Sequence, residues 1–389
     1  MTILIDPPNA AGHGRLWSHL ASDTSYEELH AFARRVGIPE RGFDRDHYDV
    51  PEERYADVVA AGARPVGSRE LVQLLIAAGL RRRKSQSLHP RPPGRLLQRP
   101  APLAPGSVVA VVTPAGPVDP GKLAIGIDVL RSWGLEVRPP AAVVPADVPW
   151  LAAADEARAA ELQDAWLDPN VAAVWCARGG FGSQRVLDLL DWRRLTTVRP
   201  RWLVGYSDVT ALHQAFAAHL GIATAHGPGV ASLPDATAET IASTRRLLLG
   251  GDSRPLVGSP AVGGQAQGSL VGGNLVMLAS MLGTPGLRPA AGGIALIEDV
   301  AEAPYRLDRL LTQLLRAGWF DDVQGIAGGD FTDCGDPDTV RDLLQRRLGP
   351  LGVPMVLDLP VGHGPTNVAL ALGRSALLDG DSGTLTPIA

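Results

Sequence analysis

The sequence lacks several features that would identify large classes of protein. It holds only two cysteines among 389 residues, Cys176 and Cys334, which are too few for a disulfide framework and show no metal-ligand spacing. No run approaches the roughly 20 apolar residues that span a bilayer, and the start, MTILIDPP, lacks the regions of a signal peptide. The net charge of −5 provides no basic excess for nucleic acid. We therefore expect a cytoplasmic protein that binds neither nucleic acid nor membrane.

The composition is otherwise that of a globular protein with several domains. Hydrophobic residues make up 45% of the chain, and its length indicates about two to four domains. Residues 85–106 are rich in Pro and Arg and lack helical or strand periodicity, which predicts an extended linker that proteases cleave. The linker follows a small α/β domain, residues 1–84, in which Ser25 and Glu28 predict a capping box. The arginines that trypsin would attack are Arg91, Arg95 and Arg99.

Hydrophobic runs after the linker predict an α/β fold. Buried-strand patterns start at Val108 and recur in AAVWC and RWLVG, and each is followed by a helical segment. Strands that alternate with helices favour a doubly wound parallel sheet, which we assign to residues 107–232. Residues 233–262, with Pro, Gly, Thr and Ser, are predicted to cross to a mixed α/β C-terminal domain, residues 263–389.

The junction Gly205-Tyr206-Ser207-Asp208 is the first candidate site. A serine on a strand-to-helix turn can project its hydroxyl into a cleft, and the backbone N–H of Asp208 would lie at a helix N-terminus that favours negative charge. The usual turn has glycine two places after the serine, where this chain has Val209. The alternative is an ordinary helix cap.

A second junction, Arg178-Gly179-Gly180-Phe181-Gly182, also follows a predicted strand. Its glycines allow backbone N–H groups to face an oxyanion or a phosphate. The spacing matches neither a dinucleotide fingerprint nor a Walker loop. The alternative is a plain tight turn.

A nucleophilic serine needs a base, and the base needs an acid that orients it. His363 is a candidate base, because it lies between glycines in a loop after an apolar strand. The candidate acids are Glu298, Asp299 and Glu302, at or beyond the end of the predicted strand GIALIED. Spacing does not choose among them.

Several segments, in this order, resemble the LD-carboxypeptidases, a serine peptidase group that also contains the microcin C-cleaving immunity proteins. The segments are VVTPAGPV (111–118), AVWCARGGFGSQRVLDLLD (173–191), LVGYSDVTALH (203–213), TAHGPGVAS (224–232), GSLVGGNLVMLASMLGTP (268–285), IALIEDVAEAPYRLDRLLTQL (294–314), GIAGGDFTDC (325–334) and PVGHGPTNVALALG (360–373). They cover most of residues 107–382, so the resemblance is far more specific than any single motif.

The resemblance implies a catalytic triad and an oxyanion site that lie between two domains. The triad residues are Ser207, Glu298 and His363, and the oxyanion or substrate-binding residues are Arg178, Gly179, Gly180 and Asp208. The resemblance also implies a homodimer and requires no metal or organic cofactor. Phe181 stands where the family more often has tyrosine.

The implied activity is hydrolysis of an L,D-peptide bond, which would release terminal D-Ala from cytoplasmic muropeptides. Hydrolysis of a microcin C-like peptide–nucleotide, or of another acylated amine, would use the same chemistry. The alternative of another class is a binding module without turnover, against which the complete candidate triad counts. A free terminal carboxylate on the substrate needs a charged or backbone partner, for which Arg178 is the candidate.

Residues 1–84 resemble a small uncharacterised domain family with the patterns IDPPNAAGHGRLWSHLASD and GFDRDHYDVPEERY. A set of acidic and histidine residues in them suits metal binding or acid–base chemistry. The set is Asp6, His13, His19, Asp23, Asp46, His47 and Asp49. Solvated or hydrogen-bonded polar side chains are the other interpretation, and the sequence leaves both open.

Overall fold

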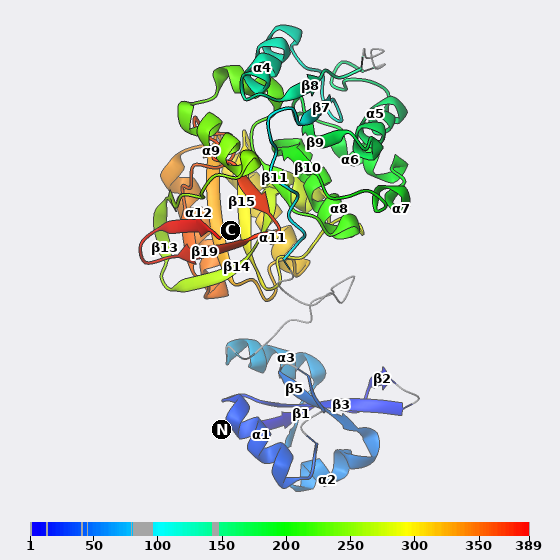
Figure 1. Ribbon diagram of the computed structural model, residues 1–389. Coiled ribbons are helices and arrows are strands. Elements are labelled where there is room, and N and C mark those ends of the chain that lie inside the picture. The colour runs from blue at the N-terminus through cyan, green and yellow to red at the C-terminus, as the bar shows by residue number, and fades with distance from the viewer. Residues whose placement is uncertain are drawn as a thin grey trace. The chain divides into compact units, whose positions relative to one another are not determined.

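A computed structural model describes residues 2–12, 15–39, 42–44, 46–78, 80, 96–141 and 148–388. The chain divides into two compact units, Met1–Lys84 and Ser85–Ala389, and each is described here by itself (Figure 1). Within the described ranges, no helix has the length and apolar character needed to cross a membrane.

The first unit is a six-stranded sheet with helices on both faces. The strand order is β4-β5-β3-β1-β6, with β2 paired to β3. Ile3 and Ile5 pack with α1, whereas Leu4, between them, packs with α3, because successive side chains of a strand point to opposite faces. The elements are β1 (Ile3–Ile5), β2 (Ala10–Gly12), β3 (Arg15–Ser22), α1 (Tyr26–Arg35), β4 (Phe43–Asp44), β5 (His47–Pro51), α2 (Tyr55–Ala60), β6 (Arg64–Pro65) and α3 (Ser68–Ala77).

The α1 helix begins where the sequence predicts. Ser25 is its N-cap, and its side chain accepts a hydrogen bond from the Glu28 N–H at 3.2 Å. The Glu28 carboxylate accepts from the Ser22 hydroxyl, and that hydroxyl in turn accepts from the Ser25 N–H. Ser22 therefore stands between the two residues, and only half of the predicted capping box forms directly.

The first sheet of the second unit has the order β18-β11-β10-β9-β7-β8. The strands from β8 to β11 run parallel, and β18 is antiparallel to β11. Helices α4 and α9 lie on one side and α5 to α8 on the other, over two separate apolar cores (Figure 1). The prediction of a doubly wound sheet is confirmed. The elements are β7 (Val108–Val112), α4 (Pro120–Ser132), β8 (Glu136–Arg138), α5 (Asp155–Leu167), β9 (Val171–Cys176), α6 (Ser183–Val186), α7 (Trp192–Leu195), β10 (Trp202–Gly205), α8 (Thr210–Leu220), β11 (Thr224–His226), α9 (Ala238–Leu249) and β18 (Leu370–Leu372).

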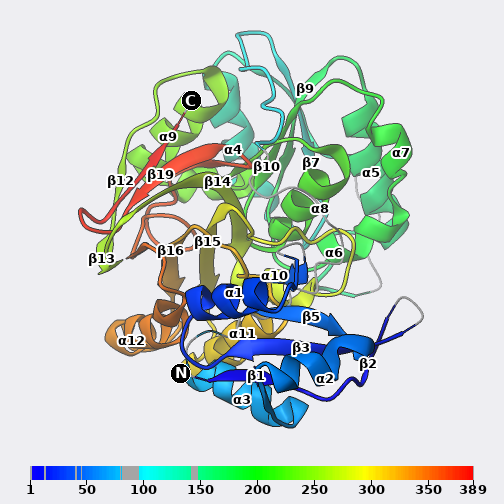
Figure 2. The same ribbon diagram turned by 90° about the horizontal axis from the view of Figure 1, so that it is seen from below.

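The second sheet contains both parallel and antiparallel strands, in the order β12-β20-β19-β14-β15-β16-β17-β13. Its central strands, β14 to β17, run parallel. Helices α10, α11 and α12 bury their apolar sides against it, and α12 lies beside β16 in Figure 2. The elements are β12 (Leu256–Val257), β13 (Ser259–Val262), β14 (Gln265–Asn274), α10 (Leu275–Ser280), β15 (Gly293–Val300), α11 (Pro304–Arg316), β16 (Gly325–Thr332), α12 (Pro337–Leu348), β17 (Met355–Leu357), β19 (Ser375–Asp379) and β20 (Thr384–Pro387).

The chain passes between the two sheets more than once. Residues 233–262, predicted to cross between domains, contain the twelve-residue helix α9, which buries Leu248 in the core of the first sheet. Late in the chain, β18 returns to the first sheet and pairs Leu372 with Thr224. The last part of the chain therefore contributes β18 to the first sheet and β19 and β20 to the second.

The described part of the predicted linker, residues 96–106, is docked on the second unit. The Leu97 N–H donates to the Gly373 carbonyl at 2.9 Å, and the Trp202 indole N–H donates to the Ala101 carbonyl at 3.0 Å. Leu97 and Leu103 are buried. The predicted extended linker therefore needs correction here, because two apolar side chains anchor the segment. Arg99 belongs to this docked stretch, whereas Arg91 and Arg95 lie outside the described residues.

Removing the Leu97 anchor should destabilise the second unit. Leu97→Ala deletes a side chain that is 7% exposed, so we expect a loss of about 2 kcal/mol or more in the free energy of unfolding. Leu96→Ala is the matched control, because Leu96 is 45% exposed and should change stability by less than about 0.5 kcal/mol. Denaturant unfolding checks both. Equal effects would mean that the segment does not depend on Leu97 for docking.

Candidate active site

The chain turns sharply from β10 into α8 at Ser207. Ser207 has a φ of 64°, in the left-handed region that strains a residue with a side chain. A Cβ on Gly205 would lie 2.8 Å from Val209 Cγ1. The turn therefore needs glycine two places before the serine, and it accommodates Val209 two places after it.

The glycine loop that ends β9 lies directly against this turn. A Cβ on Gly179 would lie 3.1 Å from Ser207 Cβ and 3.3 Å from the Asp208 nitrogen. The buried Asp208 carboxylate accepts a hydrogen bond from the Ser183 N–H at 2.7 Å, and the Ser183 hydroxyl donates to the Asp208 carbonyl. Asp208 therefore binds the start of α6, the helix after the glycine loop, and joins the two predicted junctions.

His363 and Glu298 meet at the carboxyl end of β15. The His363 Nδ1 atom lies 2.7 Å from Glu298 Oε2, and the Glu298 side chain is fully buried. Gly362 has a φ of 118°, and a Cβ there would lie 2.6 Å from the same carboxylate oxygen. The glycine before the histidine is therefore needed for the close approach of the loop to the acid.

The structure separates the three candidate acids that spacing left open. The Asp299 carboxylate accepts from the Asn274 side chain and the Val276 N–H, both at 2.9 Å, at the start of α10. Glu302 lies 3.7 Å from Arg306 in an i,i+4 ion pair. Within the described residues, Glu298 is the one candidate acid of the three that hydrogen-bonds to His363.

The serine turn and the His–Glu pair are held together by packing between the two sheets. The Tyr206 ring, next to Ser207, lies 4.9 Å from the His363 ring. The Thr210 hydroxyl oxygen accepts from the Asn274 N–H at 3.0 Å, so the helix after Ser207 contacts the network around Asp299. All three predicted triad residues therefore lie in one region.

A cleft of about 520 Å³ opens beside His363 and Tyr206. Arg178 lines it and donates from Nη1 to the Pro117 carbonyl at 3.0 Å. The arginine therefore faces the cleft and also braces the neighbouring loop. Phe181 is 51% exposed and is not among the residues that line this cleft.

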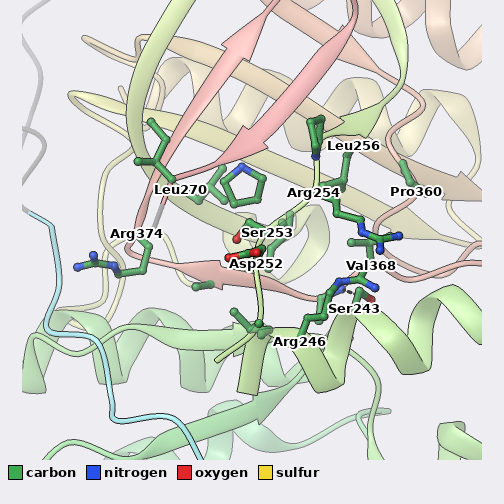
Figure 3. A pocket seen from close by; sticks show the side chains of 18 of the residues that line it. Ser243, Arg246, Asp252, Ser253, Arg254, Leu256, Leu270, Pro360, Val368 and Arg374 are labelled. Carbon is green, nitrogen blue, oxygen red and sulfur yellow. Dashed lines mark hydrogen bonds between the residues drawn. The ribbon is translucent and has the colours of Figure 1, made fainter. Parts of the chain in front are cut away.

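Another pocket, of about 380 Å³, lies beside β18 and β12 and contains none of the candidate site residues. Figure 3 shows Arg246 and Arg254 close together, with Arg374 at the opposite end. Arg246 is paired with Glu239. This pocket is separate from the cleft beside His363.

Comparisons with known proteins agree with this geometry. The family model described as the LD-carboxypeptidase N-terminal domain matches residues 109–227, and that of the LD-carboxypeptidase C-terminal domain matches residues 267–378. A model described as a protein of unknown function (DUF4031) matches residues 3–78. A putative carboxypeptidase of Streptomyces coelicolor is 47% identical over 301 residues, 75% of this chain and 96% of that protein.

The chain belongs to the LD-carboxypeptidase family, a family of serine peptidases. A murein tetrapeptide carboxypeptidase of Pseudomonas aeruginosa is 40% identical to it over 60% of this chain and 80% of that protein. The solved muramoyltetrapeptide carboxypeptidase of Oxalobacter formigenes has a TM-score of 0.65 and 31% identity, covering 72% of this chain and 97% of that one. A structure of MccF with glutamyl sulfamoyl guanosine, at 21% identity, shares the fold, with a TM-score of 0.66 over 76% of this chain and 98% of that one.

Two other histidines of the LD-carboxypeptidase unit, His213 and His226, are poor bases. Complete burial lowers the pKa of His213 to about 4 and that of His226 to about 3. His219 stacks on Trp192 with ring centroids 4.4 Å apart. His363 differs, because burial lowers its pKa but the hydrogen bond and charge of Glu298 raise it more, so that the pKa lies above the ordinary value.

Sequence reasoning missed residues that support the LD-carboxypeptidase site without a motif of their own. Ser183 and Asn274 hold Asp208 and Asp299, and Asp330 lies near His363, where burial raises the pKa of its carboxyl group to about 6. The segment GGD at 328–330 was part of the resemblance, but nothing in its spacing placed Asp330 near His363.

In the first unit, the predicted acidic and histidine set is only partly brought together. Asp6 pairs with His19, and His47 lies between Asp46 and Asp49. Asp23 lies elsewhere, where its carboxylate accepts from the Thr2 N–H at 2.9 Å. His13 lies outside the described residues.

The pairing of His363 with Glu298 can be tested directly by titration. Glu298→Gln removes the carboxylate that raises the pKa of His363 most, so that pKa should fall, with Asp299 and Asp330 still acting to raise it. Glu302→Gln should leave the pKa unchanged, because Glu302 pairs with Arg306 instead. NMR titration of the histidine ring protons measures it. A large shift in the Glu302 variant would contradict the assignment.

Proposed function

We propose that the LD-carboxypeptidase unit hydrolyses L,D-peptide bonds with a Ser207, His363 and Glu298 triad and releases terminal D-Ala from cytoplasmic muropeptides. The observation that carries the proposal is the 2.7 Å contact of His363 Nδ1 with the buried Glu298 carboxylate, beside the strained turn at Ser207. The names of the Pseudomonas aeruginosa and Oxalobacter formigenes relatives support muropeptides as the substrate class.

The Glu298 contact dictates the tautomer of the proposed base. An ionised carboxylate only accepts hydrogen bonds, so Nδ1 of His363 carries the proton that is donated to Glu298. This leaves the Nε2 lone pair to take the Ser207 proton as the serine oxygen attacks the scissile carbonyl carbon. Glu298 then stabilises the imidazolium that forms. The raised pKa makes His363 a stronger base toward the serine proton. The imidazolium that results can then donate this proton to the leaving amine.

The proposed oxyanion site follows from the contact of the two junctions. The Asp208 nitrogen lies next to the Gly179 backbone, so N–H groups of Asp208 and of the Gly179-Gly180 loop would stabilise the oxyanion. Each such donor is worth about 3 kcal/mol in the transition state. The Asp208–Ser183 hydrogen bond would keep these donors in place before substrate arrives. After the amine leaves, the water oxygen would attack the acyl carbon while His363 takes the water proton. The ester bond to Ser207 would then break, and His363 would return the proton to the Ser207 oxygen.

Loss of any triad residue should abolish turnover while the fold is retained. We expect Ser207→Ala and His363→Ala to lower kcat by about 10⁴-fold or more, because triad members act as a unit. Glu298→Ala should lower it by orders of magnitude, with Glu302→Ala as the matched control that keeps near-normal activity. The measurement is D-Ala release from an L,D-muropeptide, beside labelling with a fluorophosphonate.

The outcomes separate the alternatives. Labelling of Ser207 without D-Ala release would indicate a different substrate, either a microcin C-like peptide–nucleotide or another acylated amine. Both are tested as substrates beside the muropeptide. If the wild type shows neither labelling nor turnover, the unit is a binding module without catalytic activity.

Arg178 should recognise the terminal carboxylate of the substrate. It lines the cleft with His363, and its planar guanidinium can bind a carboxylate through two hydrogen bonds, which lysine does not reproduce. We expect Arg178→Lys to lower kcat/KM on the order of tenfold for peptides with a free carboxyl terminus. Arg185→Lys is the matched control, because Arg185 is paired with Asp155. An equal loss on amidated peptides would assign Arg178 to bracing Pro117 alone.

The predicted homodimer rests on the family resemblance alone, and light scattering of the full chain tests it. Peptidase activity across a dilution series would show whether the proposed site depends on association.

A further inference from the structure

The first unit gathers histidine and carboxylate side chains on three neighbouring strands. In the strand order β5-β3-β1, His19 on β3 is the direct partner of Asp49 on β5, and the Asp6 N–H donates to the His19 carbonyl at 3.1 Å. His47 and Asp49 are two residues apart on β5, so both side chains point to the same face. Backbone register therefore places these groups in one row across the sheet.

Each histidine is oriented by its own carboxylate. His19 Nδ1 lies 3.0 Å from Asp6 Oδ2, and His47 Nδ1 lies 2.7 Å from Asp46 Oδ1. Both of these carboxylates are buried. A ring that donates from Nδ1 to a buried carboxylate presents Nε2 as its ligand atom, and this is the usual outer shell of a metal-binding histidine.

The two rings and a third carboxylate face a common point. The ring centroids of His19 and His47 lie 4.8 Å apart, and one ligand atom from each of His19, His47 and Asp49 can be chosen so that all lie within 4.8 Å of one another. The His47 Nε2 and Asp49 Oδ1 atoms are 3.3 Å apart. Ligand atoms around a tetrahedral zinc ion are separated by roughly 3.4 Å.

One atom of this group lacks the hydrogen bond that its burial calls for. His47 Nε2 is buried and makes no hydrogen bond within the described chain, although Asp49 lies beside it. Buried polar atoms in native proteins nearly always have a partner, so such an atom needs an explanation. A metal ion bound between His47, His19 and Asp49 would supply that partner.

We propose that the first unit binds one divalent transition-metal ion, such as Zn²⁺, through His19, His47 and the Asp49 carboxylate, with Asp6 and Asp46 orienting the two rings. Two imidazoles and one carboxylate are a donor set for zinc, and for iron or manganese in more open geometry. The side chains of His19 and Asp49 are 31% and 45% exposed. Three protein ligands and an open side leave a coordination position for water or a substrate oxygen.

The site is independent of the proposed peptidase chemistry. All five residues belong to Met1–Lys84, and none of them lies in the unit that holds Ser207 and His363. A failure of the metal proposal would therefore leave the carboxypeptidase proposal untouched, and the reverse also holds.

The experiment is metal binding by the full chain. After removal of bound metal, the wild type should take up one equivalent of Zn²⁺ in isothermal titration calorimetry, and metal content measured after dialysis should agree. Asp49→Asn and His47→Gln should abolish this binding. Asp6→Asn, which leaves all three ligands in place, should weaken it about 10–100-fold, the usual effect of an outer-shell change.

Two control variants make the result specific. His30 belongs to the same unit but lies outside the cluster, with its Nδ1 atom 2.8 Å from the Tyr48 hydroxyl. The His30→Gln variant should therefore bind the ion as the wild type does. His363→Gln should also retain the ion, which excludes binding at the peptidase site.

The proposal is overturned if the wild type binds none of Zn²⁺, Mn²⁺ and Fe²⁺, or if Asp49→Asn and His47→Gln bind as tightly as the wild type. Circular dichroism verifies that each variant is folded. Asp49 is half exposed on the sheet surface, so its variant decides the matter if His47→Gln does not fold.

Discussion

The arrangement of the LD-carboxypeptidase site depends on one interaction, the hydrogen bond between the buried Glu298 carboxylate and His363. Glu298 lies at the carboxyl end of a central parallel strand, and its Oε1 atom has no hydrogen-bond partner within the described chain. The stability of its charge therefore depends on His363, which contacts the other oxygen. Removing one partner of a buried pair of this kind costs about 3–5 kcal/mol. The histidine loop is thus tied to the sheet by the same contact that would orient the base.

Close approach of backbone segments makes this contact possible. Gly362 and Gly329 both lie against Glu298, and a Cβ on either would enter the space of its side chain. On the serine side, a Cβ on Gly179 would crowd the Ser207 side chain, and a Cβ on Gly205 would crowd that of Val209. The glycines that the sequence shows as flexible positions are, in the folded chain, the places where no side chain fits. They bring three separate loops to one point.

The fold joins two halves that each hold part of the site. Ser207 and the glycine loop follow strands of the first sheet, whereas Glu298 lies on β15 of the second sheet. His363 lies in the loop that leads from β17 of the second sheet to β18 of the first. The Thr210–Asn274–Asp299 hydrogen bonds and the return of β18 to the first sheet connect them. The first unit is a separate compact body with its own His–Asp network. The two proposed sites therefore lie in separate units.

Local sequence patterns were enough to predict much of the fold. The alternation of apolar runs with helical segments predicted the doubly wound sheet, because strands and turns are encoded over a few residues. The triad of Ser207, Glu298 and His363 was implied by the resemblance of the ordered motifs to the LD-carboxypeptidases. Pairing across the chain was not visible. Three findings arise from contacts between residues far apart in sequence. They are the pairing of His363 with Glu298, the docking of Leu97, and the position of Asp23 beside Thr2 instead of in the His19 cluster. Such contacts depend on strand register and burial, which only the tertiary structure decides.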